Sequence, residues 1–410
     1  MIAIAHLHPT HFAQEVALAL REGGADVELL TTLTPDGRDP AARLLKLLGA
    51  GNKRRVDASL QTAVQTYPWR ELWRMAAGQL GADERQRDTF FHWALDGFDA
   101  WVARQMKPPV RMIYAYETQC LKAFTAARAR GITTVLDLPS PEHDYVENLL
   151  NEEYAKFPGL LTPAKQYFRT LQAERTARRH REFELADVVV ANSHFTARTW
   201  ADAGLDGSKI RVVPLGGPEP DPLGAEGGTR GQGPLRLVWA GTFSVRKGAH
   251  YLLEAWRRWN PGAAAVLDVY GTVALPPSLL EGLPSNIVMH GPVNRDRVLE
   301  EFLRSDLLIF PTLCDGFGLV VPEALSKGLP VLTTTRAGAA DLIRDGVNGV
   351  LVEAGSADDL QRGLAWALGN RQQLASMRTA ALETARSHQW QDYRIRLANV
   401  LRKNAGGAAT

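Results

Sequence analysis

The chain has 410 residues, a length that favours two domains at roughly 100 to 200 residues each. Hydrophobic residues make up 45% and charged residues 22%, a globular balance that excludes wholesale disorder and a collagen-like repeat. The net charge of +2 gives no reason to expect nucleic-acid binding. Two cysteines, Cys120 and Cys314, are too few for a disulfide framework or for a metal site built from cysteine alone.

The N-terminal half alternates strand-like and helical patterns. Residues 1–31 predict a strand, a helix and a second strand, and further strand-like apolar runs follow at 111–116, 132–138, 187–192 and 210–214. Parallel strands need a covering helix as crossover, so we expect a doubly wound α/β sheet. Between the second and third of these strands, residues 39–107 contain two amphipathic patterns and are predicted to be a helical insertion.

A change of composition marks the expected domain boundary. Residues 216–234 are rich in glycine and proline, which predicts a linker, and six strand-like runs after it predict a second α/β unit. We therefore place one Rossmann-like domain at 1–215 and another at 235–387. A C-terminal helix at about 388–405 is expected to pack back on the first domain, and the last residues are predicted to be a frayed tail.

The first motif that suggests chemistry is WAGTFSVRKGAHYLLEA at 239–255, which runs from a strand through a glycine turn into a helix. Arg246 and Lys247 stand close to the helix start. Backbone N–H groups, the helix dipole and two cations can converge on one anion, and a diphosphate is the natural guest. An isolated Arg-Lys-Gly triplet is more often a solvated turn, so this assignment depends on its context.

The second motif is the Asp-Gly-Phe-Gly turn at 315–318, between a strand and a helix. Its glycines let the backbone approach a ligand closely, and the helix start supplies unpaired donors. Glu323 stands eight positions after Asp315. Its carboxylate can accept hydrogen bonds from the paired hydroxyls of a ribose, or it can merely complement the helix dipole, and the spacing alone does not separate these two readings.

Together with the segment at 328–360, these motifs resemble the donor domain of family-four retaining glycosyltransferases of the GT-B fold, the glycosyl transferases group 1. Several ordered motifs at consistent spacings make the resemblance specific over about 235–366, whereas the N-terminal half matches by pattern only. The resemblance implies two facing Rossmann-like domains with a cleft between them. It also implies a UDP- or GDP-linked sugar as donor and neither cofactor nor metal, because cationic side chains and helix dipoles neutralise the leaving diphosphate.

By this resemblance Arg246 and Lys247 hold the donor diphosphate, Glu323 binds the ribose and Val293 lies near the base. The donor-binding set is completed by Gly241, Thr242, Gly316, Phe317, Gly318, Leu319 and Val320, and the catalytic set is His143, Asp315 and Glu323. The chain departs from the family at two positions, with Asp315 where glutamate is usual and Thr242 where arginine often follows the glycine. Retention of configuration is also implied, for which we expect front-face attack assisted by the departing phosphate.

The N-terminal half offers acceptor-side candidates after its strands. His143 follows the strand at 132–138, at the level where the family places a cleft histidine, although a lone histidine is nearly as often a packed or solvent-facing side chain. The others follow further strands: His8, Thr10, His11, Tyr116, Glu117 and Ser193.

We therefore expect a retaining hexosyltransferase that acts on a glycan, a lipid-linked or another glycoconjugate acceptor. A nucleotide-sugar epimerase of the GT-B fold is one alternative, and it rests on fold analogy. A non-catalytic module that binds a nucleotide sugar or a glycan is another, motivated by Asp315 and Thr242. A dinucleotide dehydrogenase ranks lowest, because no Gly-x-Gly-x-x-Gly follows a strand.

Location is predicted from apolar and basic segments. No apolar run reaches the roughly 18 to 20 residues needed to cross a bilayer, and the first residues lack the features of a signal peptide, so we expect a cytoplasmic protein. Basic segments at 43–55 and 169–184 suggest peripheral contact with the anionic inner face of a membrane. Solvated helix faces are the alternative for each segment.

Overall fold

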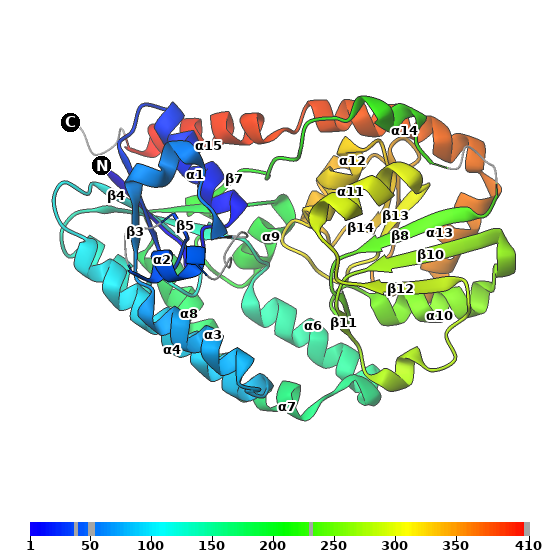
Figure 1. The fold of residues 1–410 in the computed structure, drawn as a ribbon, viewed down its shortest axis with the longest axis horizontal. Helices are drawn as coiled ribbons and strands as arrows, with labels where there is room; N and C mark the ends of the chain where they lie inside the picture. The colour runs from blue at the N-terminus through cyan, green and yellow to red at the C-terminus, as the bar shows by residue number, and fades with distance from the viewer. Residues whose placement is uncertain (37–39, 48–53, 229–232, 406–410) are drawn as a thin grey trace.

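The structure, a computed structural model, describes residues 1–36, 40–47, 54–228 and 233–405. It consists of two α/β domains side by side, each built on one parallel sheet (Figure 1). The predicted α/β class with two Rossmann-like domains is confirmed. Each sheet carries helices that cover its apolar strands, as parallel sheets require.

The first sheet has seven strands in the order β3-β2-β1-β4-β5-β6-β7. Their bounds are β1 Ile2–Ala5, β2 Val27–Thr31, β3 Val64–Thr66, β4 Met112–Tyr116, β5 Thr133–Leu138, β6 Val188–Ala191 and β7 Ile210–Val212. β3 pairs in parallel with β2 and lies between the two segments that we predicted to be helical. This strand was not predicted, because three residues are too few to show a strand period.

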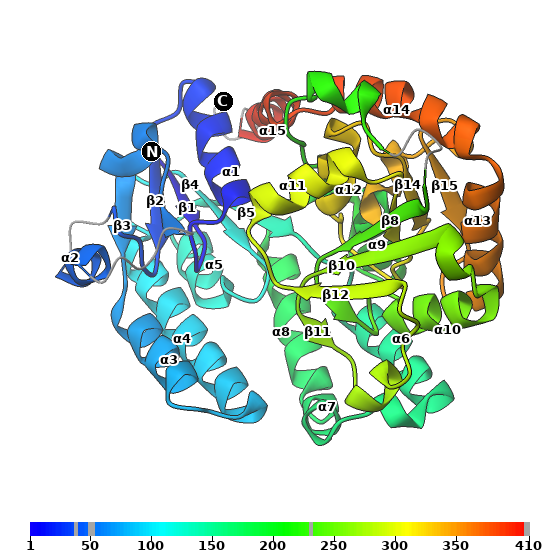
Figure 2. The ribbon, with the colours of Figure 1, turned by 45° about the vertical axis from the view of Figure 1, so that its right-hand side comes forward.

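The helices of this half are α1 His11–Glu22, α2 Pro40–Leu47, α3 Trp69–Gln79, α4 Glu84–Gln105, α5 Leu121–Arg128, α6 His143–Lys156, α7 Pro163–Arg169, α8 Gln172–Leu185 and α9 His194–Asp202. α3 and α4 lie side by side as a hairpin (Figure 2). The N-terminus of α4 is fixed by a capping box, in which Asp83 and Gln86 satisfy each other's backbone N–H groups. The buried face of α4 then packs Phe98 and Val102 into the core.

The second domain has six strands in the order β12-β10-β8-β13-β14-β15, and each coincides with a predicted run. Their bounds are β8 Leu235–Ala240, β10 Ala265–Tyr270, β12 Ile287–Gly291, β13 Leu307–Phe310, β14 Val331–Thr334 and β15 Gly349–Val352, with a small separate pair β9 Phe243–Ser244 and β11 Val273–Ala274. The helices are α10 Ala249–Trp259, α11 Arg295–Arg304, α12 Val320–Ser326, α13 Ala357–Gly369, α14 Arg371–Arg386 and α15 Trp390–Ala405.

Residues 216–228 of the Gly/Pro-rich segment pack on the second domain. Lys327 Nζ lies 2.8 Å from Asp221 Oδ2, and Arg378 Nε donates to the Gly224 carbonyl at 2.7 Å. Gly224 is buried against the backbone of Lys327, where a Cβ would lie 2.7 Å from a carbonyl carbon. Residues 229–232 of the predicted linker lie outside the described residues.

The end of the chain returns to the first domain. Gly217 N donates to the His388 carbonyl at 2.8 Å, so the two crossing segments run side by side between the domains. α15 then packs on α1, where Arg394 Nη1 lies 2.7 Å from Glu15 Oε2 and Tyr393 and Leu397 join the core. Of the predicted frayed tail, residues 406–410 lie outside the described residues.

α6 crosses the predicted domain boundary in the opposite direction. It belongs to the first domain in sequence, yet Tyr154 at its end and Leu160 just after it pack into the hydrophobic core of the second domain. His250 Nε2 of α10 lies 3.0 Å from Glu153 Oε2 of α6, and both side chains are buried. The two domains therefore contact each other through packed side chains as well as through the linker.

Candidate functional site

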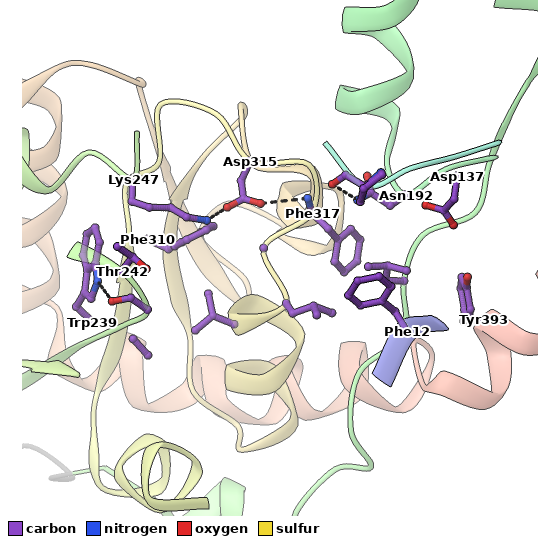
Figure 3. A pocket seen from close by; sticks show the side chains of 17 residues that line it. Phe12, Asp137, Asn192, Trp239, Thr242, Lys247, Phe310, Asp315, Phe317 and Tyr393 are labelled. Carbon is purple, nitrogen blue, oxygen red and sulfur yellow. Dashed lines mark hydrogen bonds and ion pairs between the residues drawn. The ribbon is translucent and has the colours of Figure 1, made fainter. Parts of the chain in front are cut away.

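One cavity of about 380 Å³ lies between the two domains, at the carboxyl ends of strands from both sheets (Figure 3). Its wall on the side of the first domain is formed by Phe12, Asp137, Pro139, Asn192, Leu215 and, from α15, Tyr393. The wall on the side of the second domain is formed by Trp239, Ala240, Gly241, Thr242, Lys247, Phe310, Asp315, Phe317, Gly318, Leu319 and Val320.

Sheet topology explains this position. β8 lies at the centre of the second sheet, and the chain continues from it to β10 on one side and later to β13 on the other. Loops that leave such a point in opposite directions open a crevice at the strand ends, which is where ligands bind in doubly wound sheets. The loops after β8 and β13 supply the polar groups of this wall.

Lys247 and Asp315 form an ion pair at the cavity wall (Figure 3). Arg246 Nη1 lies 3.7 Å from the same carboxylate oxygen and donates to the Cys314 carbonyl at 2.9 Å. Burial and then repulsion from Arg246 lower the pKa of Lys247 to about 7, while contact with Asp315 favours the charged form. Of the two predicted cations, Lys247 lines the cavity and Arg246 does not.

The turn after β13 presents its backbone to the cavity. Phe317 N donates to Asp315 Oδ1 at 3.3 Å, which closes the turn. Gly318 has a φ of 89°, and a Cβ at this position would lie 2.7 Å from the Phe310 ring, so both conformation and space require glycine. Four predicted donor-binding positions therefore line the cavity: Phe317, Gly318, Leu319 and Val320.

Gly316 does not line the cavity and instead joins the two domains. Its carbonyl accepts hydrogen bonds from Ser193 Oγ at 2.6 Å and Thr196 Oγ1 at 3.1 Å, both at the start of α9. A Cβ on Gly316 would lie 2.0 Å from the Pro139 carbonyl oxygen. Our assignment of Gly316 to the donor and of Ser193 to the acceptor is therefore corrected, because the two residues use their polar groups on each other.

Glu323 lies in a neighbouring cavity of about 280 Å³, which shares Phe12 and Leu319 with the first. Its Oε1 accepts from Arg295 Nε at 2.7 Å. Burial raises the pKa of Glu323, and the Arg295 guanidinium opposes this effect. His11, predicted on the acceptor side, lines this second cavity with its ring edge-on to Trp390.

Of the remaining donor-side predictions, two residues line the first cavity and one does not. Gly241 and Thr242 line the first cavity, and the Gly241 carbonyl accepts from Trp239 Nε1 at 3.1 Å. Val293 follows β12 with 40% of its surface exposed and lines neither cavity, so its predicted place near the base is not supported.

His143 lies outside both cavities. It is the first residue of α6, and its Nδ1 lies 2.7 Å from Thr176 Oγ1 of α8. Burial and the Arg179 guanidinium lower the pKa of His143 to about 4, so the ring is neutral at physiological pH. The predicted catalytic role is corrected here, because the first turn of α6 directs the ring onto α8 and away from the cavity.

The other acceptor-side candidates are held inside the first domain. His8 Nε2 lies 3.0 Å from Glu71 Oε1 of α3. Tyr116 is 1% exposed and packs in an aromatic cluster with Phe12. None of four predicted residues lines either cavity: His8, Thr10, Tyr116 and Glu117. The strand-end rule placed them at the correct edge of the sheet, but not with side chains facing the cleft.

Sequence reasoning missed two polar groups that do face the cavity. Asp137 accepts a hydrogen bond from the Tyr114 hydroxyl, and burial raises the pKa of Asp137 to about 7. Asn192 Nδ2 donates to the Pro139 carbonyl at 2.8 Å, and within the described chain its Oδ1 has no hydrogen-bond partner. The available signal was an aspartate inside an apolar strand run and an asparagine directly after one.

Within the part of the chain that the structure describes, no group of three or more His, Cys, Asp or Glu side chains is arranged to hold a metal ion. Metal independence stays a prediction.

Most of the second domain matches a known protein family. Residues 228–384 match the family described as glycosyl transferases group 1. A D-inositol 3-phosphate glycosyltransferase of Nocardia farcinica is 29% identical over 225 residues, which are 50% of this chain and 50% of that protein. Its namesake in Xylanimonas cellulosilytica is 23% identical over 83% of this chain and 78% of its own length. The match therefore spans about half the length of the Nocardia relative.

Solved structures of similar fold cover both domains. Anabaena HepE in complex with UDP is 17% identical, covers 98% of this chain and 99% of its own, and has a TM-score of 0.62. Sucrose-phosphate synthase from Thermosynechococcus elongatus is 16% identical, covers 100% and 99%, and has a TM-score of 0.65. At these identities the likeness concerns the fold.

Proposed function

The chain belongs to the glycosyl transferases group 1 through its C-terminal domain, and from this premise we propose that it transfers a sugar from a nucleoside diphosphate to an acceptor. The observation that carries the proposal is the convergence of Lys247 and the 315–320 turn on one cavity between two Rossmann-like domains. HepE, of similar fold, has been solved with UDP and with UDP-glucose, which supports a nucleotide sugar as the donor. We propose a UDP- or GDP-linked hexose.

Lys247 is the group that meets the diphosphate. In the structure its charge is paired with Asp315 inside a largely buried site. A diphosphate brings more negative charge than one carboxylate, so it competes with Asp315 for the ammonium group and stabilises its protonated form. The same contact stabilises the leaving diphosphate as its charge develops during transfer. The backbone of the glycine turn lies close enough to the cavity to add N–H donors.

The wall from the first domain faces the part of the donor that reacts. Asp137 and Asn192 lie across the cavity from Lys247 (Figure 3). A carboxyl group with a pKa of about 7 and a free amide oxygen are suited to hold sugar hydroxyls. We propose retention of configuration by front-face attack, in which the departing phosphate accepts the proton of the acceptor hydroxyl. Neither metal nor cofactor is required for this step.

Glu323 is proposed to bind the ribose. Its cavity joins the first one at Phe12 and Leu319, so a nucleoside can lie there while its diphosphate reaches Lys247. The carboxylate is already held by Arg295, which orients it and leaves its second oxygen for hydroxyl contacts.

A thermal-shift screen of UDP, GDP and their hexose derivatives tests the donor. A ligand that binds the folded state raises the midpoint, and Lys247→Ala should abolish the shift. Donors that shift the midpoint are then incubated with and without glycan or lipid-linked acceptors. Acceptor-dependent release of nucleoside diphosphate supports a transferase, a changed sugar without acceptor indicates the epimerase alternative, and binding without either reaction indicates a non-catalytic module.

We also propose that the first domain contacts an anionic bilayer through the α3–α4 hairpin. Trp69 and Trp73 on α3 are 59% and 67% exposed, and tryptophan favours the membrane–water interface. Across the described ranges, no helix is long and apolar enough to cross a membrane. Co-sedimentation with phosphatidylglycerol vesicles should be lost in Trp69→Ser/Trp73→Ser and kept in Leu223→Ser, which removes an exposed apolar side chain elsewhere. Equal sedimentation of the unsubstituted protein, the double tryptophan variant and Leu223→Ser would overturn the proposal.

The two basic segments give this contact less support than expected. Arg175 and Arg178 of the 169–184 segment point inward to Asp88 and Asp99, so they do not form a free basic face. Residues 48–53 of the 43–55 segment lie outside the described residues.

A further inference from the structure

A further cavity, of about 340 Å³ and lined mostly by polar residues, lies wholly within the first domain, between α4, α7, α8 and the loop after β4. Six charged residues line it, three acidic and three basic: Asp88, Asp96, Glu174, Arg175, Arg178 and Arg179. Tyr167 adds an aromatic ring, and Thr89 and Thr118 add hydroxyls. None of these residues takes part in the donor site described above.

The arginines of this cavity are held by carboxylates. Arg175 Nη2 lies 2.6 Å from Asp88 Oδ2, and Arg178 Nη2 lies 3.0 Å from Asp99 Oδ2. Arg178 Nε also lies 3.3 Å from Glu182 Oε1, and Asp99 and Glu182 are buried beneath the cavity. The positive charge is therefore balanced, so an anionic ligand gains little net attraction. Guanidinium and carboxylate groups remain fixed side by side as donors and acceptors.

His92 on the same wall adds no charge. Burial and the neighbouring arginines lower the pKa of His92, so its ring is neutral at physiological pH and can both donate and accept a hydrogen bond. A neutral ring among balanced ion pairs again favours a ligand with many hydroxyls over one with a net charge.

The cavity adjoins the site of transfer. Arg179 on its wall lies 3.8 Å from Glu117 Oε2, and Glu117 N donates to the Asp137 carbonyl at 3.1 Å. Asp137 lines the interdomain cavity. One ion pair and one backbone hydrogen bond therefore link the walls of the two cavities. Thr118 of this cavity follows β4, and Asp137 of the interdomain cavity lies near the carboxyl end of the neighbouring strand β5.

We propose that this cavity is a second carbohydrate subsite, which binds a neutral sugar unit of the acceptor at a distance from the hydroxyl that reacts. Sugar hydroxyls donate and accept at once, so they match a wall that carries both carboxylates and guanidinium groups, and Tyr167 adds an aromatic ring to that wall. The proposal rests on the transferase function proposed above, and it defines the acceptor as a glycan chain.

Thr89→Trp tests the subsite by filling it. Thr89 is exposed on α4, and its hydroxyl bonds only back to the Arg85 carbonyl at 3.0 Å, so the fold should tolerate the change. Thr125→Trp on α5 is a matched control, since Thr125 is exposed and makes the same kind of bond to Leu121. With a glycan acceptor, Thr89→Trp should raise the acceptor KM at least tenfold and leave the donor KM and the kcat at saturating acceptor unchanged. Thr125→Trp should behave as the unsubstituted protein.

Direct binding separates this proposal from the transferase proposal. Saturation-transfer NMR with maltose, lactose and cellobiose, in the presence of UDP, should give sugar signals that Thr89→Trp removes and Thr125→Trp keeps. Such signals without any turnover would uphold the subsite while the transferase proposal failed. Turnover with equal acceptor KM in both variants would overturn the subsite and leave the transferase proposal standing. The absence of any sugar signal would also overturn it, and binding of inorganic phosphate that Thr89→Trp removes would then indicate an anion site.

Discussion

The two walls of the interdomain cavity are assembled in different ways. The wall of the second domain draws its polar groups from two short segments, 239–247 and 310–320, whose order and spacing are visible in the sequence. The opposite wall combines Phe12, Asp137, Asn192 and Tyr393, which come from α1, β5, the loop after β6 and α15. The polar groups of one wall are therefore encoded in local motifs, whereas the opposite wall is a product of chain topology.

Lys247→Ala is the change expected to have the largest effect on this contrast. It removes the cation that lines the cavity, and a charge-assisted hydrogen bond is worth about 1.5 to 3 kcal/mol, so kcat/KM for the donor should fall roughly 10- to 100-fold. Lys327→Ala is the control, because Lys327 also forms a part-buried ion pair, with Asp221, but lines no described cavity. Unchanged nucleotide affinity in Lys247→Ala would show that Lys247 does not bind the diphosphate.

Gly316→Ala tests the contact that joins the two walls. The added Cβ would lie 2.0 Å from the Pro139 carbonyl oxygen, so the domains must separate or the turn must shift. Overpacking of this kind costs about 1 to 3 kcal/mol, and we expect a lower midpoint of unfolding together with a roughly tenfold loss of kcat/KM. Gly369→Ala is the control, since outside its chain neighbours and the backbone of its own helix no atom lies within 4 Å of its Cβ position. Full activity with an unchanged midpoint would show that the interdomain contact is dispensable.

Asp137→Asn tests the topological wall through pH. Burial raises the pKa of Asp137 to about 7 from the usual value near 4, so the folded state retains the proton between these values while the unfolded chain loses it. The free energy of unfolding of the native protein should therefore fall progressively as the pH rises from about 4 to 7. The asparagine variant should have a higher midpoint of unfolding than the unsubstituted protein at pH 8 and nearly the same midpoint at pH 4. Equal differences at both values would contradict the buried carboxyl group.

His143→Ala should have the smallest effect. The ring bonds Thr176 of α8 and lines neither cleft cavity, so we expect a less than twofold change in kcat with a small loss of stability. A steady-state assay at saturating donor measures this directly. A tenfold or greater loss of kcat with intact nucleotide binding would return His143 to the catalytic set.

The sequence by itself determined the fold class, the strand runs and the donor-side motifs. Continuous apolar runs of four to six residues are long enough to show their type, and residues close in sequence, such as Asp315 and Phe317, have few ways to be arranged around a tight turn. The strand β3 was missed because it has three residues and takes its stability from pairing with β2.

Only the tertiary structure decided which strand-end residues face the cleft. A strand end fixes the edge of the sheet at which a side chain lies, but the rotation of each loop and the packing of helices decide its direction. The His143 ring contacts α8 and the Gly316 carbonyl accepts a hydrogen bond from Ser193, whereas Asp137 lines the cavity. Tyr393 lies in the same wall although it is far from Asp137 in the sequence. It lies there because α15 returns to the first domain and buries its apolar face against α1.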